Sequence, residues 1–108
     1  GVLTATRCVG QGLRRTAVTA AGVDVRWRSG GEVCQPAGRA HHHALKKLFQ
    51  EAGIPPWQRD RIPLLYIDQR LAAVAGLWVC DPFQAGPGED GYRIHWQAGQ
   101  PGPPGRAD

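Results

Sequence analysis

The chain has 108 residues, a formal net charge of +4 and an apolar fraction of 42%, which suit one small domain with a modest core. No apolar run reaches the length of a membrane span, and the first residues lack the order of a signal peptide. We therefore expect a cytoplasmic protein with no membrane partner. Because methionine is absent and the sequence begins with glycine, we also expect a piece of a longer protein.

The three cysteines, Cys8, Cys34 and Cys80, are far apart and form no CxxC pair. An odd number of widely spaced cysteines argues against a disulfide framework and against a zinc site. We therefore expect reduced, partly buried thiols and no metal or cofactor bound by this chain.

Positive charge is concentrated in the first two-thirds of the sequence. Residues 1–70 hold eleven Lys or Arg against five Asp or Glu, whereas residues 71–108 hold two against four. This asymmetry and the sequence pI near 9.4 are typical of nucleic-acid-binding domains. A GC-rich genome would also raise the arginine content, so composition alone leaves the partner open.

The N-terminal third predicts two strands. Residues 1–22 predict a short strand near residues 2–6 and a connecting segment, which belongs either to this domain or to the end of a preceding one. From residue 23 to residue 28 apolar and polar side chains alternate, which predicts a strand with Trp27 in the core and Arg26 and Arg28 in water.

A glycine-rich turn follows that strand. Ser29, Gly30 and Gly31 resemble part of a phosphate loop, but no parallel βαβ pattern surrounds them, so we interpret them as a turn between strands. We expect Glu32 to cap a backbone amide in this turn or to pair with Arg39.

Residues 42–52 predict the principal helix of the domain. Leu45, Leu48, Phe49 and Ala52 are spaced i, i+3, i+4 and i+7, which gives one apolar stripe. The triplet of residues 41–43 consists of histidines, whose side chains point in different directions and favour either phosphate approach or a solvated helix entry over a metal site.

The end of this helix is well marked. Gly53 can take the left-handed position that follows a helix, which would fold Ile54 back onto Phe49. Pro55 and Pro56 prevent continuation, and Pro56 can open a second short turn. We expect Trp57 on that turn to pack into the core, because large aromatic side chains usually do.

The C-terminal part predicts a buried hairpin and a last strand. The hairpin joins residues 64–67 to residues 71–74, and the last strand covers residues 92–97. We expect residues 98–108 to form a disordered tail. The predicted fold class is α+β: a small single domain, residues 23–97, of mainly antiparallel strands packed around one principal helix.

The central sequence resembles a known family. Leu45-Lys-Lys-Leu-Phe-Gln-Glu-Ala-Gly-Ile-Pro-Pro-Trp57, the following Arg59-Asp-Arg-Ile-Pro-Leu-Leu-Tyr66 and Ala73-Val-Ala-Gly-Leu-Trp-Val79 resemble the C-terminal domain of tRNA(Ile)-lysidine synthetase. The resemblance implies a tRNA-binding module that engages the acceptor stem. It places catalysis, with ATP and magnesium as cofactors, in a separate N-terminal domain of the parent enzyme.

The residues themselves show no nucleophile, base and acid brought together, so we expect no catalytic site in this chain. The functional hypothesis is a phosphate-binding surface that reads RNA backbone and shape. If about four phosphates are bound, the logarithm of the affinity should fall with the logarithm of the salt concentration at a slope of about −3. The predicted RNA-binding residues are Arg26, Arg28, Arg39, Lys46, Lys47, Arg59 and Arg61.

The alternative hypothesis is a structural or protein-interaction domain. In that interpretation the basic face is incidental, and the apolar hairpin packs against other domains of the same chain or against a second subunit. Charge reversal of Lys46, Lys47, Arg59 and Arg61 should abolish tRNA binding under the first hypothesis and should change little under the second.

Overall fold

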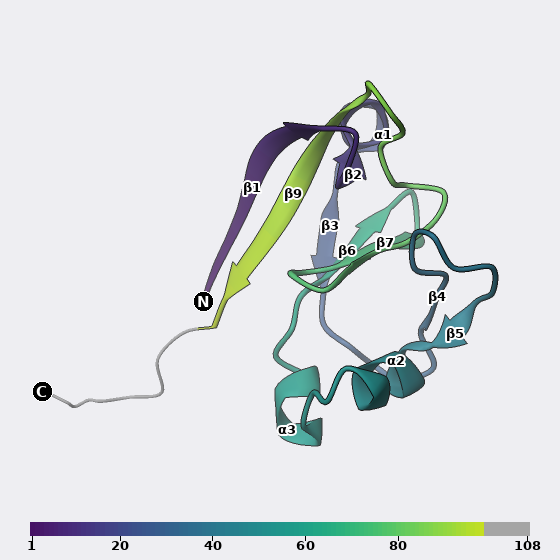
Figure 1. Ribbon diagram of the computed structural model, residues 1–108. Helices are drawn as coiled ribbons and strands as arrows, with labels where there is room; N and C mark the ends of the chain where they lie inside the picture. Colours follow the sequence, from purple (N-terminus) through teal and green to yellow (C-terminus); the bar gives the residue numbers. More distant parts are fainter. Residues whose placement is uncertain (99–108) are drawn as a thin grey trace, which may run out of the picture.

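A computed structural model describes residues 1–98 as an α+β domain of short helices and three antiparallel sheets (Figure 1). The helices of this part of the chain are α1 (Arg15–Ala21), α2 (Leu45–Glu51) and α3 (Pro56–Arg59). In Figure 1, α1 lies at the top of the domain, and α2 and α3 lie at the opposite end.

The first sheet is a long two-stranded ribbon extended by a short third strand. Its order is β1-β9-β2, and β1 pairs with β9 over its whole length. The second sheet, in the order β3-β6-β7-β8, is the centre of the domain, and β4 and β5 form a separate pair. The strands are β1 (Val2–Val9), β2 (Leu13–Arg14), β3 (Asp24–Arg26), β4 (Val33–Cys34), β5 (His43–Ala44), β6 (Leu64–Ile67), β7 (Arg70–Val74), β8 (Trp78–Val79) and β9 (Asp90–Gln97).

The β6–β7 hairpin separates two buried clusters. Successive side chains of a strand point to opposite faces, so Leu64 belongs to one cluster and Leu65 to the other. Both faces of the hairpin are covered, which explains its continuous apolar sequence and confirms the predicted buried hairpin. Asp68 and Gln69 join the strands with φ values of 52° and 67°, the left-handed geometry of a two-residue hairpin turn.

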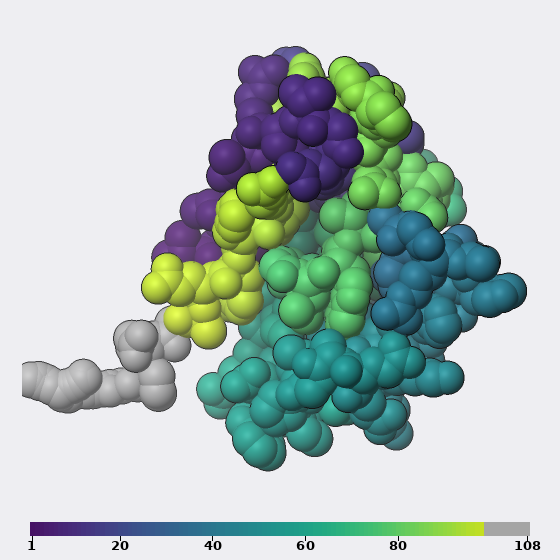
Figure 2. Space-filling model, in the orientation of Figure 1, coloured from purple at the N-terminus to yellow at the C-terminus, as the bar shows by residue number. Residues whose placement is uncertain are grey.

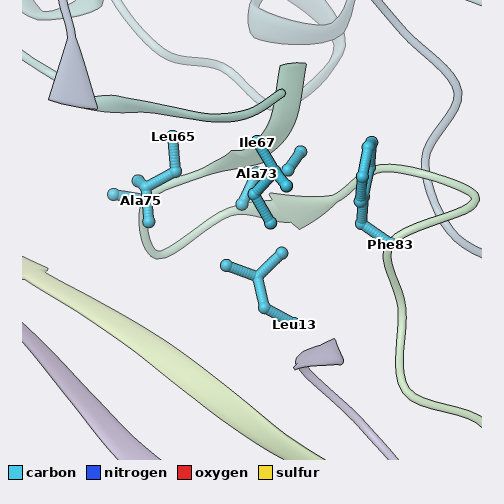
Figure 3. Close-up of a cluster of buried hydrophobic side chains, with 7 residues drawn as sticks. Leu13, Leu65, Ile67, Ala73, Ala75 and Phe83 are labelled. Atoms are coloured by element: carbon cyan, nitrogen blue, oxygen red, sulfur yellow. The ribbon is translucent and has the colours of Figure 1, made fainter. Parts of the chain in front are cut away.

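The first cluster fills the space between the hairpin and the ribbon (Figure 3). Leu13 from β2 and Phe83 from the loop between β8 and β9 belong to the same cluster as the hairpin residues. Because Leu13 is 1% exposed, residues 1–22 contribute to the core rather than only connecting to it. The members of this cluster are Leu13, Leu65, Ile67, Ala72, Ala73, Ala75 and Phe83.

The second cluster lies between the hairpin and α2. Three of the four residues of the predicted apolar stripe, Leu45, Leu48 and Phe49, are buried on α2. The fourth, Ala52, follows the last residue of the helix and is exposed. The three buried residues pack against Leu64 and Val74 of the hairpin. The helix is nevertheless shorter than residues 42–52, because residues 43–44 pair with β4 as β5. With α1 of equal length in the segment expected to be a connector, a single principal helix is not evident.

The expectation of three reduced thiols was wrong for two of them. Cys34 and Cys80 form a disulfide with a Cα–Cα distance of 5.8 Å, and both are 1% exposed. Their separation of 46 residues in sequence gave no sign of this pairing, which arises because the chain after β8 pairs with the chain after β4. Cys8 remains free and partly buried.

The predicted orientation of the strand at residues 23–28 was also wrong. Trp27 is 56% exposed, and Val25 is 50% exposed. The Arg26 guanidinium lies 4.5 Å from the centre of the Tyr66 ring, although its side chain remains 40% exposed. Val25 within β3 and Trp27 just after its end are both exposed, so the expected core face of this segment is turned outward. The tail expected at 98–108 lies, apart from residue 98, outside the described residues.

Candidate nucleic-acid interface

The α2–α3 corner, defined here as residues 45–61, is built around a sharp helix end. Gly53 has φ 74°, and its N–H donates to the Gln50 carbonyl at 3.1 Å. The Ile54 N–H donates to the Phe49 carbonyl at 2.9 Å. These two bonds form a Schellman motif, as the sequence predicted. Proline at position 56 then opens α3, also as predicted.

A buried arginine fixes α3 against α2. Arg59 is 8% exposed, its Nε donates to the Ile54 carbonyl at 2.8 Å, and its guanidinium lies 6.0 Å from the centre of the Phe49 ring. Pro55 and Pro56 carry no N–H, so an arginine side chain supplies the donor that the backbone lacks here. The expectation that Arg59 faces outward was therefore wrong.

Trp57 was predicted to be a core residue, and this was also wrong. It is 73% exposed on the outer side of α3. The Arg59 side chain takes the inner side of this one-turn helix, which leaves the indole in solvent. Trp57 and Arg59 are two positions apart on a single helical turn, so their side chains point in different directions. This spacing could have indicated that only one of them is buried.

Three predicted RNA-binding residues of the corner are exposed cations. Lys46 and Lys47 lie on the side of α2 away from its apolar stripe, and Arg61 follows α3. Within residues 1–98, none of the three is within ion-pair distance of a carboxylate. Figure 2 shows this part of the chain, in teal, as the lower end of the molecule. The three cations are therefore available to an external anion.

The remaining predicted cations have internal partners. Arg26 is bound to Asp24 at 3.3 Å, and its guanidinium also donates to the Gln69 side chain at 2.9 Å. Arg28 pairs with Asp60 at 3.4 Å and is largely buried over the Phe49 ring. Arg26 thus connects β3 to the hairpin at a partly exposed position, and Arg28 connects the segment after β3 to the corner.

Arg39 pairs with Glu51 at 3.2 Å, which ties the loop before β5 to the end of α2. Its side chain is 46% exposed, so the pair lies at the surface, where such an interaction is weak. Arg39 thus keeps part of its guanidinium accessible. The seven predicted residues consequently divide into three unpaired surface cations, three ion-paired arginines and the buried Arg59.

The loop before β4 is organised by a carboxylate, as expected for Glu32. Its oxygens accept from the Ser29 N–H at 2.8 Å, the Gly30 N–H at 3.0 Å and the Ser29 hydroxyl at 3.1 Å. Partial burial alone would raise the pKa of Glu32, but these hydrogen bonds outweigh it and hold the pKa below its usual value. The Glu32 carbonyl also accepts from the Leu45 N–H at 2.8 Å, at the start of α2.

The corner contains cations, an exposed indole and backbone held by hydrogen bonds, which together suit anion and aromatic contact.

Across residues 1–98, no group of three or more His, Cys, Asp or Glu side chains converges as metal ligands would. The histidines at 41–43 precede α2, and only His43 lies in a strand. No helix of the described part is long and apolar enough to cross a membrane.

Comparison with known proteins identifies similar chains. The family described as "TilS substrate C-terminal domain" matches residues 23–96. The tRNA(Ile)-lysidine synthase of Coxiella burnetii is 47% identical over 97 residues, which cover 90% of this chain and 21% of that protein. The enzyme of the same name from Methylococcus capsulatus is 44% identical over 97 residues, covering 89% and 22%. The chain thus spans about a fifth of the length of these relatives.

Proposed function

The chain belongs to the family of C-terminal substrate domains of tRNA(Ile)-lysidine synthase, and on this basis we propose that it binds the acceptor stem of an isoleucine tRNA. The family relationship supports tRNA as the partner. The observation that carries the proposal is the set of exposed cations in the corner that have no carboxylate partner among residues 1–98, namely Lys46, Lys47 and Arg61.

An acceptor stem suits such a surface. An A-form helix has a deep, narrow major groove that side chains cannot enter, so a protein binds it through phosphates, 2′-hydroxyls and overall shape. Lysine and arginine on short, well-supported elements provide these contacts without reading the bases. The ion-paired Arg39 is a further phosphate ligand at the margin of the corner, since its side chain stays 46% exposed.

The proposed role in the parent enzyme is positioning. Contacts far from the reacting atoms reduce the freedom that the substrate loses at the active site, and a long RNA offers many such contacts. In this proposal the rest of the parent enzyme, located in the cytoplasm, ligates lysine to the anticodon cytidine with ATP and magnesium. None of these steps is assigned to residues of this chain.

The test is a titration of the 108-residue chain with an acceptor-stem minihelix at several salt concentrations. Each phosphate that displaces counterions contributes about −0.7 to −0.9 to the slope of log affinity against log salt, so three contacts predict a slope of about −2 to −3. A single-stranded RNA of equal length is the control and should bind more weakly, because it lacks the A-form backbone that the proposal requires. Absence of binding, or binding that does not respond to salt, would contradict the proposal.

A second candidate function rests on a different surface. An apolar recess of about 230 Å³ lies between the ribbon, α1 and the hairpin, and its lining includes Leu3, Val18, Val23 and Leu65. It favours docking of another domain of the same chain or a second subunit. Under that alternative, reversing the charges of the corner would leave the function of the domain unchanged.

A further inference from the structure

Trp57 is the most exposed of the large hydrophobic side chains in residues 1–98, at 73% of its surface. The other tryptophans have ring partners. Trp27 packs edge-on against Trp96 with ring centres 6.3 Å apart, and Trp78 packs against Phe49 at 5.7 Å. The aromatic pairs of the described residues do not include Trp57. Its indole therefore does not contribute to the core as the others do.

The backbone that carries Trp57 is firmly held. Pro55 and Pro56 fix two φ angles immediately before it. The Gln58 N–H donates to the Pro55 carbonyl, and the Arg61 N–H donates to the Gln58 carbonyl, both at 3.0 Å. The buried Arg59 closes the inner side of the turn. An indole on such a support loses little conformational freedom when it binds a flat partner.

The charge around this indole favours a nucleic acid as that partner. Asp60 and Glu51, the nearest acidic residues in sequence, are paired with Arg28 and Arg39. Lys46, Lys47 and Arg61 remain without carboxylate partners in the described part of the chain. Arg59 holds α3, which carries Trp57 and is followed by Arg61, against the end of α2, and the exposed side of α2 carries Lys46 and Lys47.

We propose that Trp57 stacks on an unpaired nucleobase beyond the last base pair of the acceptor stem. This inference rests on the proposed function and specifies which part of the RNA reaches the corner. Bases inside a duplex are stacked on one another, so an aromatic side chain can cover only a base that is unpaired or at the end of the stack. The single-stranded 3′ end of a tRNA supplies such bases next to the phosphates of the stem.

The experiment compares two RNAs that share one duplex, of which one carries a four-nucleotide 3′ extension and the other is blunt. Base–aromatic stacking is worth about 1–3 kcal/mol, so Trp57→Ala should weaken binding of the extended RNA by roughly 5- to 150-fold. Binding of the blunt RNA should not change. Trp57→Phe should recover most of the lost affinity, and the salt slope should stay the same, because an indole displaces no counterions.

Trp27→Ala is the matched control, since Trp27 is the other exposed tryptophan and lies outside the corner. Thermal melting confirms that each variant is folded, and Trp27→Ala should bind both RNAs as the unchanged chain does. Equal binding by Trp57→Ala and the unchanged chain would overturn the stacking contact while leaving the proposed function intact. An equal loss on both RNAs would also overturn it, because the contact would then be to the duplex. Failure of the unchanged chain to bind either RNA would overturn both proposals.

Discussion

The β1–β9 ribbon with its adjoining helix α1 and the α2–α3 corner both carry surface cations, but their charges are arranged differently. In the ribbon, Arg7 and Arg15 share the carboxylate of Asp90 at 3.4 and 3.5 Å. In the corner, Lys46, Lys47 and Arg61 have no such partner among residues 1–98. A phosphate approaching Arg7 or Arg15 meets charge that Asp90 partly neutralises, whereas one approaching Lys46, Lys47 or Arg61 meets cations without an ion-pair partner in the described residues. Arg93 of β9 is also exposed and outside these ion pairs, so the contrast concerns the Asp90 cluster rather than the whole ribbon.

This difference shows that the total charge of the domain says little about where an anion binds. Exposed ion pairs such as those of Asp90 contribute only about 0–1 kcal/mol to stability. Their larger consequence is local, because each carboxylate reduces the attraction that a nearby arginine exerts on a phosphate. The corner achieves the opposite arrangement by turning its acidic neighbours, Glu51 and Asp60, toward Arg39 and Arg28.

The largest expected effect is the loss of RNA affinity when the cations of the corner are neutralised. Three phosphate contacts at about 0.1 M salt contribute roughly 100- to 500-fold to the affinity, so replacing Lys46, Lys47 and Arg61 by glutamine should remove that factor. The slope of log affinity against log salt should become shallower by about 2–3. The measurement is the titration with the minihelix at several salt concentrations.

The matched variant replaces Arg7 and Arg15 of the ribbon by glutamine and should change the affinity much less. Circular dichroism checks that both variants are folded. An equal loss of affinity in the two variants would contradict the proposal that RNA binds to the corner rather than to the ribbon.

The fold was predictable where the local pattern decides the structure. The apolar stripe of α2, the Schellman end at Gly53 and the buried β6–β7 hairpin all follow from spacing and from glycine or proline at defined positions. These features depend on neighbours within a few residues. The family likeness was stated from the same segment and is confirmed by the match to residues 23–96.

Other features could not be predicted in this way, because they depend on contacts between distant segments or depart from a general expectation. The Cys34–Cys80 disulfide joins residues 46 positions apart. The inward position of Arg59 involves nearby partners, the Ile54 carbonyl and the Phe49 ring, but it contradicts the general expectation that an arginine lies in water. For the same reason, the sequence could not separate the three unpaired cations from the four that serve the fold.

The second prediction compares the two arginines on either side of Asp60. Arg59→Ala should lower the free energy of unfolding by about 1–3 kcal/mol, because the Ile54 carbonyl loses its side-chain donor and Phe49 loses a packing partner. Arg61→Ala should change it by less than about 0.5 kcal/mol, because Arg61 is exposed. Urea unfolding followed by circular dichroism measures both.

The variant Arg59→Met separates the two contributions of the buried arginine, since it keeps most of the side-chain volume but removes the donor. It should fall between the alanine variant and the unchanged chain. Equal stability of Arg59→Ala and Arg61→Ala would show that the inner and outer sides of the corner do not differ as the structure indicates.

The smallest expected effect is a change in the pH dependence of stability, caused by Glu32 in the loop before β4. The hydrogen bonds from Ser29 and Gly30 hold the pKa of Glu32 below its usual value of 4.5, even though partial burial acts in the opposite direction. A carboxyl whose pKa is lower in the folded state stabilises the fold above its unfolded pKa, and this contribution disappears as the pH falls through the folded value. Glu32→Gln should therefore be slightly less stable than the unchanged chain at pH 7, and the difference should shrink at an acidic pH well below 4.5, as the folded carboxyl becomes protonated. Urea unfolding of both proteins at the two pH values measures the effect, and a difference that persists unchanged in acid would mean that the charge of Glu32 does not stabilise this loop.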